Sequence, residues 1–335
     1  MTIPGAAKLA SVVREFGRRT IVVVGDLITD EFLFGKPARI SREAPVLILR
    51  FTEREVLLGG AANAAHNTHA LGARVLPVGV LGTDAAADEA LALFGGAGIK
   101  TDGIVRERGR MTPMKTRIMA GGYQATRQQV VRVDREPSGE PAPATEDALL
   151  ARLDAVARDT DAIVLSDYGY GAVTPRVLDR VRALARRTIV TVDSRYDLPR
   201  FTGLTAATPN EAELAQLTGE PVDDERGIEK AGRQVLERLG ARMLLVTRGS
   251  QGMALLERDG ATTFISIHGS DEIADVTGAG DTVISTFTLA LASGATPLEA
   301  ATLANIAGGL VVMKRGTATV SGAELLRELG ESAAP

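Results

Sequence analysis

Short apolar runs of strand length alternate with segments of helical pattern along most of this chain, and no other feature limits its possible folds as strongly. Because a strand–helix–strand unit places its two strands parallel, the alternation predicts an α/β fold. We expect a doubly wound, mostly parallel sheet with helices on both faces. The predicted strands are Ile21–Val24, Val75–Val80, Ile163–Leu165, Thr188–Val192 and Met243–Val246, and the predicted helices are Ala61–Leu71, Asp84–Phe94, Pro175–Ala185, Asn210–Leu217 and Ile228–Leu239.

Two regions break this alternation, because their strand-like runs have no crossover helix beside them. The runs are Val46–Phe51, Lys115–Ala120 and Gln128–Val133, and Gly121–Gln124 suits a hairpin turn between the last two. We therefore expect one domain over residues 1–335 with a small antiparallel β lid. The lid would consist of inserted segments at about 31–58 and 110–136, and Ser138–Ala144 would lead out of it.

Polar residues follow five of the apolar runs of strand length. The carboxyl ends of parallel strands lie along one edge of a sheet, where ligands bind, so these residues should converge on one site. Each of them could instead only cap the helix that follows. The residues are Asp26, Asp167, Asp193, Asn210 and the pair Thr247-Arg248.

The turn Asp275–Asp281, with the sequence DVTGAGD, precedes an apolar helix with the sequence TVISTFTLALA. Glycines allow a ligand to approach the backbone, and the free N–H groups of a helix start can receive phosphate oxygens. Asp281 could then accept a hydroxyl proton during phosphoryl transfer. Alternatively, the turn is an ordinary helix entry. A dinucleotide-binding motif fits less well, because Val283 replaces its third glycine, and the chain contains no P-loop.

Composition limits the classes of function. The net charge is −4, and there is no tryptophan and only 4% aromatic residues, which argues against nucleic-acid binding. The absence of cysteine excludes disulfides and cysteine–zinc sites. No apolar stretch approaches the ~18 residues of a membrane span. We therefore expect a cytoplasmic enzyme.

The DVTGAGD turn and its helix resemble the signature of the ribokinase-like (PfkB-type) carbohydrate kinases. The resemblance runs along nearly the whole chain, through VVGDLITDEF, GGAANAAHNTHALG, TPNEAEL and NIAGGLVVMKRGTATV. It implies a ribokinase-like fold and ATP-dependent phosphorylation of a sugar or sugar phosphate hydroxyl. In that family such lids often join two subunits, so a homodimer through the lid is expected.

Three further stretches resemble the members of this family that phosphorylate the anomeric hydroxyl of heptose 7-phosphate in lipopolysaccharide-precursor synthesis. They are GKPARISREAPVLIL, TPMKTRIMAGGYQATRQQVVRVD and LSDYGYGAV. The product would be the 1,7-bisphosphate. Those kinases often continue into a nucleotidyltransferase domain, for which a chain ending at Pro335 leaves no room. Two positions depart from their pattern: Tyr170 stands in place of a lysine, and Asp193-Ser194-Arg195 in place of D-P-K.

The resemblance assigns roles by position. Asp281 would be the base, and the N–H groups of Gly278, Ala279 and Gly280 would hold the γ-phosphoryl oxygens. The substrate residues would be Asp26, Asp30, Gly59, Gly60 and Asn63, together with Asp167 from the strand ends. Lys115 and Arg117, two residues apart on a predicted lid strand, share a face; they could hold a substrate phosphate or form only a solvated basic face. The nucleotide residues would be Asp193, Asn210, Thr247, Gly249, Gly252 and Asn305. Glu213 would organise Mg²⁺, through water, and Asp275 and Thr277 would form a K⁺ site.

Several alternatives stay open at this point. Another sugar or sugar phosphate could be the substrate, or the chain could be a non-catalytic sensor of sugar or nucleotide, although a sensor has no use for the base. A nicotinamide dehydrogenase is a more distant option. His66 and His69 lie three residues apart on a predicted helix, but no third metal ligand is obvious.

Overall fold

A nine-stranded sheet forms the centre of the computed structural model, which describes residues 5–121, 127–269, 275–314 and 316–330. Its strand order is β13-β12-β11-β10-β9-β8-β1-β4-β5. The pairings from β11 to β5 are parallel, and β12 and β13 continue the sheet antiparallel at one edge. The strands are β1 (Thr20–Gly25), β4 (Arg74–Leu81), β5 (Ile104–Arg106), β8 (Ala162–Asp167), β9 (Ile189–Ser194), β10 (Ala206–Ala207), β11 (Met243–Thr247), β12 (Met253–Glu257) and β13 (Thr262–Ile265).

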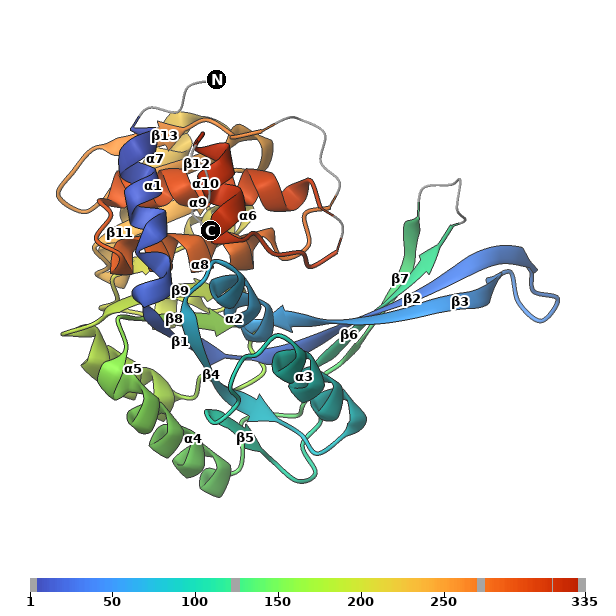
Figure 1. Ribbon diagram of the computed structural model, residues 1–335. Coiled ribbons are helices and arrows are strands. Elements are labelled where there is room, and N and C mark those ends of the chain that lie inside the picture. Colours follow the sequence, from blue (N-terminus) through green and yellow to red (C-terminus); the bar gives the residue numbers. More distant parts are fainter. Residues whose placement is uncertain (1–4, 122–126, 270–274, 315, 331–335) are drawn as a thin grey trace.

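Helices cover both faces of this sheet, and each face has its own apolar core (Figure 1). Side chains alternate along a strand, so Ile21 and Val23 of β1 enter one core while Val22 and Val24 enter the other. One core packs against α1 (Ala6–Arg14), α2 (Ala61–Ala70), α3 (Ala85–Gly96), α8 (Ala279–Ala292), α9 (Pro297–Val312) and α10 (Gly322–Glu328). The other packs against α4 (Pro143–Val156), α5 (Pro175–Ala185), α6 (Glu211–Thr218) and α7 (Glu225–Leu239).

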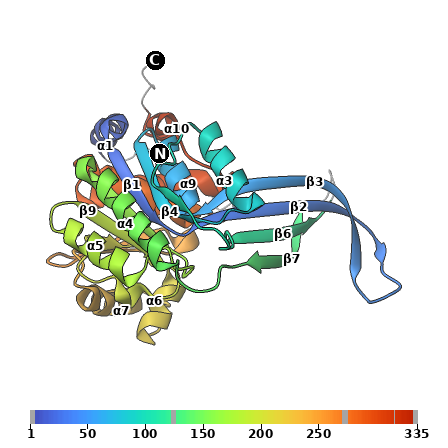
Figure 2. The same cartoon turned by 90° about the horizontal axis from the view of Figure 1, so that it is seen from below.

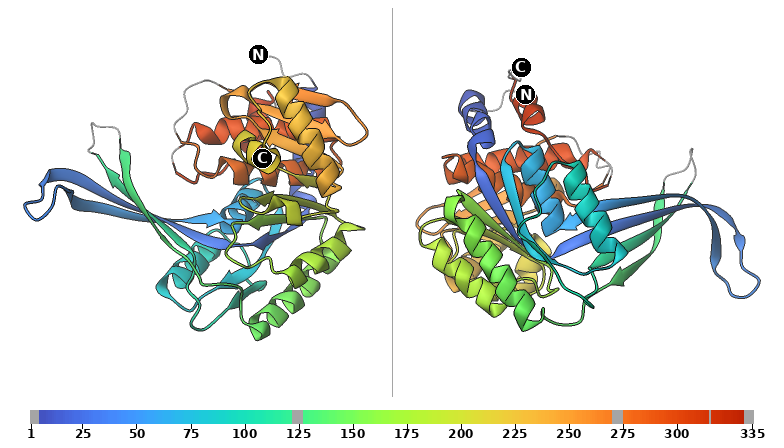
Figure 3. Two further views of the ribbon diagram at one scale, coloured as in Figure 1. Left: turned by 180° about the vertical axis from the view of Figure 1, so that it is seen from behind. Right: turned by 60° about the horizontal axis from the view of Figure 1, so that its bottom comes forward.

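A second, four-stranded sheet, called the small sheet below, extends away from this body (Figures 1 and 2). Its order is β3-β2-β6-β7, formed by β2 (Leu27–Ile40), β3 (Leu47–Gly60), β6 (Met114–Ala120) and β7 (Gln128–Arg135). Two antiparallel pairs, β2–β3 and β6–β7, are joined by a parallel pairing of β2 with β6. The views from behind and from below show the same long arm beside the helical body (Figure 3).

The predicted fold class is confirmed: a mostly parallel sheet with helices on both faces, together with a smaller sheet built from antiparallel pairs. Sequence reasoning found only the start of β3, as the run Val46–Phe51. It did not find β2, whose strand signal Gly35 and Pro37 weaken. Irregular pairing at these two residues accommodates them in the strand. The predicted exit loop was too long, since α4 already begins at Pro143. Most of the predicted hairpin turn lies outside the described residues.

No helix among the described residues is long and apolar enough to cross a membrane.

Candidate active site

The polar residues predicted at strand ends do lie along one edge of the large sheet. Asp26 follows β1, Asp167 ends β8, Asp193 lies near the end of β9, Asn210 follows β10 and Thr247 ends β11. These strands are direct neighbours in the order β11-β10-β9-β8-β1. The N-terminus of α8 packs near the same edge, because α8 contacts both β8 and β9.

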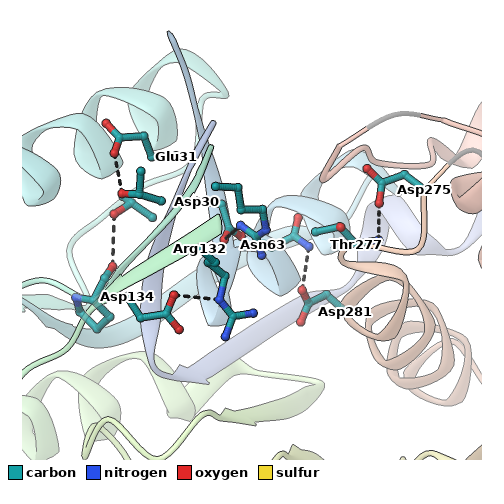
Figure 4. A network of polar contacts seen from close by, with 12 residues as sticks. Asp30, Glu31, Asn63, Arg132, Asp134, Asp275, Thr277 and Asp281 are labelled. Carbon is teal, nitrogen blue, oxygen red and sulfur yellow. Dashed lines mark hydrogen bonds and ion pairs between the residues drawn. The ribbon is translucent and has the colours of Figure 1, made fainter. Parts of the chain in front are cut away.

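Asp281 lies in the first turn of α8 with only 4% of its surface exposed. One carboxylate oxygen, Oδ2, accepts a hydrogen bond of 2.7 Å from the Asn63 amide of α2, and the two side chains point toward one another (Figure 4). The other oxygen, Oδ1, is buried without a hydrogen-bond partner among the described residues. Burial raises the pKa of Asp281 to about 7, and the charge of Asp30 adds to the rise. Such a carboxylate suits general base catalysis near neutral pH.

The turn before α8 leaves backbone donors available. Gly278 caps the helix with φ of 78°, and a Cβ atom there would lie 2.6 Å from the Asn63 amide nitrogen, so only glycine fits. The N–H of Ala279 is already used, since it donates to the Val276 carbonyl at 3.2 Å. The N–H groups of Gly280 and Asp281 have no partner within the described ranges. An anion at this helix start would therefore meet Gly280 and Asp281 rather than Ala279.

The two aspartates predicted to bind the sugar lie in different surroundings. Both oxygens of buried Asp26 accept backbone N–H groups, from Tyr168 (2.8 Å), Tyr170 (3.1 Å) and Ala172 (3.0 Å). Asp26 thus anchors the loop after β8. Asp30, in contrast, is close enough to Asp281 to raise its pKa. Asp30 therefore lies near Asp281, with one of its oxygens paired to Arg117.

The glycines that precede α2 allow β3 to approach β2 closely. A Cβ atom on Gly59 would lie 2.3 Å from an Asp30 carboxylate oxygen. Gly60 has φ of 53°, and a Cβ there would lie 2.7 Å from the Ile28 side chain. Both glycines are therefore required by contacts within the protein, whether or not a ligand binds.

Lys115 and Arg117 lie on one face of β6, as their spacing predicted, and pair in register with Asp30 and Phe32 of β2. Arg117 forms an ion pair with Asp30 at 2.5 Å. Lys115 has no carboxylate within 4 Å in the described part of the chain; its Nζ lies 4.6 Å from the centre of the Tyr168 ring. Burial lowers the pKa of Lys115. Lys115 is thus a cation near Asp281 that makes no ion pair within 4 Å among the described residues, although the charges of Asp30 and Asp134 are close enough to act on it.

Asp167 and Asp193 also differ in how many of their oxygens are engaged by the protein. Asp167 is buried and fully engaged, because it accepts hydrogen bonds from Ser194 (2.8 Å) and Arg200 (2.9 Å). Asp193 lies beside the α8 turn, since a Cβ on Gly280 would be 3.8 Å from its Oδ2. Burial and the negative charges of Glu213 and Asp281 raise the pKa of Asp193.

A pocket adjoins the α8 turn and encloses about 660 Å³, open solvent included. Its walls are mostly apolar, and its polar residue Asn305 donates from Nδ2 to the Ser266 carbonyl at 2.7 Å. The predicted nucleotide residues Thr247, Gly249, Gly252 and Asn305 all line it, as do Ala279 and Gly280. Sequence reasoning missed its apolar walls because they have the pattern of ordinary core: Met253, Ile267, Val276, Val283 and Val312, together with Gly308 and Gly309.

The predicted metal residues have structural contacts of their own. Asn210 and Glu213 form a reciprocal capping box at the start of α6, with bonds of 2.9 and 3.0 Å. Asp275 accepts N–H groups from Thr277 (2.9 Å) and Gly316 (3.1 Å). The described residues contain no group of three or more His, Asp or Glu side chains placed to hold a metal ion. Among these residues, the pair His66 and His69 therefore has no third ligand beside it.

Comparison with known proteins agrees with this geometry. Residues 18–323 match the pfkB family carbohydrate kinase. The chain is 40% identical to the bifunctional protein HldE of Geobacter sulfurreducens over 94% of its own length, and to that of Mesorhizobium japonicum over 99%. It spans 64% and 66% of the length of these two relatives.

Solved structures show the same fold. An Arabidopsis thaliana ribokinase complexed with ribose and ATP superimposes with a TM-score of 0.75 at 21% identity, covering 94% of this chain and 99% of that one. Phosphofructokinase-2 of Escherichia coli in complex with substrates and products gives 0.74 at 16% identity, covering 93% and 98%. Together with the buried carboxylate at the start of α8, the match over residues 18–323 shows that this chain belongs to the pfkB family of carbohydrate kinases.

Proposed function

We propose that this chain transfers the γ-phosphoryl group of ATP to a hydroxyl of a sugar phosphate, with Asp281 as the base. The observation that carries the proposal is the buried Oδ1 of Asp281, which accepts no hydrogen bond from the described residues and lies in the turn bordering the pocket. Its pKa of about 7 lets the carboxylate take a proton at neutral pH. We propose heptose 7-phosphate as the substrate and its anomeric hydroxyl as the acceptor, from the three stretches that resemble heptose 7-phosphate kinases.

The nucleotide fits the site as follows. The adenine ring of ATP would occupy the apolar pocket lined by Val283 and Asn305, with the triphosphate directed toward the start of α8. There the N–H groups of Gly280 and Asp281 would receive the γ-phosphoryl oxygens. Mg²⁺ would be held mainly by phosphates and water, with Glu213 and Asp193 near it, and would neutralise charge on the transferred group. Both oxygens of Asp275 already accept N–H groups, so the residues described give a K⁺ site no further support.

The acceptor side favours an anionic sugar. Lys115 lies near Asp281 without an ion-pair partner among the described residues. Burial lowers its pKa, Arg132 and Arg195 lower it further, and Asp30 and Asp134 act in the opposite direction. A substrate phosphate would supply the missing negative charge. A kinase for another sugar phosphate would use the same cation, so heptose 7-phosphate has to be tested against other sugars.

The small sheet contributes to the site through Asp30 and Lys115, so we propose that it acts as the lid. Closure over the substrate would exclude water and limit wasteful hydrolysis of ATP. We also propose that two copies associate through this sheet as a homodimer, on the face opposite the site.

A substrate panel tests the proposal. Purified protein with Mg²⁺ and ATP would be assayed with heptose 7-phosphate, fructose 6-phosphate, free hexoses and no sugar, by release of ADP. We expect turnover with heptose 7-phosphate well above the others. Turnover only with another sugar would overturn the heptose assignment and keep the kinase. No sugar-dependent turnover at all, with ATP bound, would favour a sensor.

Asp281→Asn tests the base. We expect turnover to fall by about 10²–10⁴-fold, because general base catalysis contributes that much. ATP binding, measured by calorimetry, should stay within a few-fold of the unmodified protein, since the backbone donors remain. A variant that keeps the original kcat would refute the role of Asp281.

A further inference from the structure

Asn63, one of the predicted substrate residues, donates a hydrogen bond from its amide to Asp281. We propose that two buried residues behind it, Asn67 and Thr282, are positioning residues. They fix the orientation of the Asn63 amide and thereby decide which oxygen of Asp281 is presented to the acceptor. This inference rests on the proposed function of Asp281 as the base.

The four side chains form one continuous chain of hydrogen bonds between α2 and α8. The Thr282 hydroxyl donates to Asn67 Oδ1 at 2.7 Å. Asn67 Nδ2 donates to Asn63 Oδ1 at 3.0 Å. Asn63 Nδ2 donates to Asp281 Oδ2 at 2.7 Å, the last link drawn in Figure 4. All four residues are buried, with exposures of 0 to 4%, so water cannot replace a lost partner.

The contacts of Asn67 and Thr282, away from Asp281, determine how the amide groups in this hydrogen-bond network are turned. The Thr282 hydroxyl donates to Asn67 Oδ1 and has a longer contact of 3.4 Å to the Gly278 carbonyl, so Asn67 turns its carbonyl oxygen to Thr282 and its NH₂ group to Asn63. Asn67 is also held within α2, because Nδ2 donates to the backbone oxygen of Asn63 at 3.0 Å. A flipped Asn63 would place its oxygen against the Asp281 carboxylate and its NH₂ against that of Asn67. Both contacts are unfavourable in a buried site.

This arrangement matters most at the moment of proton transfer. Once Asp281 has accepted a proton it no longer attracts the Asn63 amide as an anion does, but the bond from Asn67 does not depend on that charge. Oδ2 therefore stays engaged, and Oδ1 remains the oxygen that faces the acceptor in every cycle. The other groups that face Asp281 are Asp30 of β2, Lys115 of β6, Asp193 of β9 and Tyr168 after β8.

Thr282→Val removes the hydrogen bond to Asn67 with little change in the shape of the side chain. We expect kcat to fall roughly tenfold, and the acid limb of the pH profile of kcat/KM to move up by about half a unit or more, because a hydrogen bond to the ionised form lowers a pKa. Thr282→Ser keeps the hydroxyl and should restore both. The KM for ATP should change less than twofold in either variant.

Thr286→Val is the matched control. Thr286 lies one turn further along α8, is equally buried, and donates only to the Thr282 carbonyl at 2.8 Å. It should lose similar stability while keeping the original pH profile. If Thr282→Val does not fold, Asn67→Leu breaks the same chain from α2 and should shift the profile likewise.

The outcomes separate the two proposals. If Asp281→Asn is inactive but Thr282→Val and Asn67→Leu match Thr286→Val in kcat and pH profile, the positioning role is refuted and the base stands. If Asp281→Asn is active, the proposed function itself fails, whatever the other variants do.

Discussion

At the scale of single residues, the buried charge of Asp281 predicts how activity depends on pH. Because its pKa is about 7, most of the base is protonated at pH 6 and inactive. We expect kcat/KM to rise about tenfold per pH unit below the pKa and to level off above it. Rates from pH 5.5 to 9, in buffers of constant ionic strength, give the apparent pKa. A limb near pH 4 would contradict the burial argument.

The same burial predicts an effect on stability. An unfolded aspartate has a pKa of about 3.9, so between pH 4 and 7 the folded state binds more protons than the unfolded state. The free energy of unfolding therefore falls as pH rises through this range. Asp281→Asn removes the charge and should raise that free energy by roughly 1–4 kcal/mol at pH 8.

Below pH 4 the gain should vanish, because both states of the original aspartate are then protonated. Urea unfolding of the two proteins at acid and alkaline pH makes the comparison. Asp102→Asn, at an exposed position, is the control and should change stability little at either pH. Equal stabilisation by Asp281→Asn at both pH values would point to packing rather than charge.

At the scale of elements, the N-x-x-E pattern has two roles that a pair of variants can separate. Asn210→Ala removes the cap of α6 and should cost about 0.5–2 kcal/mol of stability. Glu213→Gln keeps an oxygen that can accept the Asn210 N–H, so stability should hardly change. It removes only the charge that we propose lies near Mg²⁺, and should raise the Mg²⁺ concentration needed for half-maximal rate if that proposal holds.

Thermal unfolding and Mg²⁺ titrations of both variants provide the measurement. If Glu213→Gln matches the unmodified protein in its Mg²⁺ dependence, the residue is a helix cap and nothing more.

A partly exposed network of ion pairs links the small sheet to α3, and it predicts a second effect at this scale. Arg54 of β3 donates to Glu31 of β2 at 2.7 Å and to both oxygens of Glu89 of α3 at 2.8 and 2.9 Å. Glu89→Ala should therefore loosen the sheet that carries Asp30, and raise the KM for the sugar more than the KM for ATP.

Asp88→Ala is the matched control for Glu89→Ala. Asp88 pairs with Arg106 at 2.7 Å from the same helix but does not contact the small sheet. Since half-exposed ion pairs contribute at most about 1 kcal/mol, both variants should fold. Equal KM values for the two variants would contradict a positioning role of the Arg54 network.

The elements themselves were largely predictable, because alternating strands and helices and a glycine-rich turn are local patterns. The choice between Asp26 and Asp30 was not. Both follow β1 closely in sequence, and only the folded loop at 168–172 shows that Asp26 is used up by backbone N–H groups. The apolar walls of the pocket beside α8 could not be predicted for a related reason. Val276 and Val283 have the pattern of core residues, and only the structure shows the pocket that they line.

At the scale of the whole molecule, the site depends on contacts between distant parts of the chain. The convergence of strand ends followed from parallel topology, and could be predicted. The pairing of β2 with β6, which brings Lys115 beside Asp30, could not, because a parallel pair between inserted strands leaves no local signal. The Asn63–Asp281 bond likewise joins residues from opposite ends of the chain.

The small sheet has two unlike faces, and this difference predicts the state of association. Its strand registers place Phe51, Val131 and Val133 on the face opposite Lys115, where they are 68, 45 and 48% exposed. Apolar side chains gathered on one face of an extended sheet favour burial against another surface, and a second copy offers an identical one across a two-fold axis.

We expect a dimer of twice 35.1 kDa by light scattering after gel filtration. Phe51→Glu combined with Val131→Glu should give the monomer mass, whereas Leu298→Glu, an exposed apolar residue on α9, should not. A monomeric unmodified protein across a wide range of concentration would show that this face stays open to solvent.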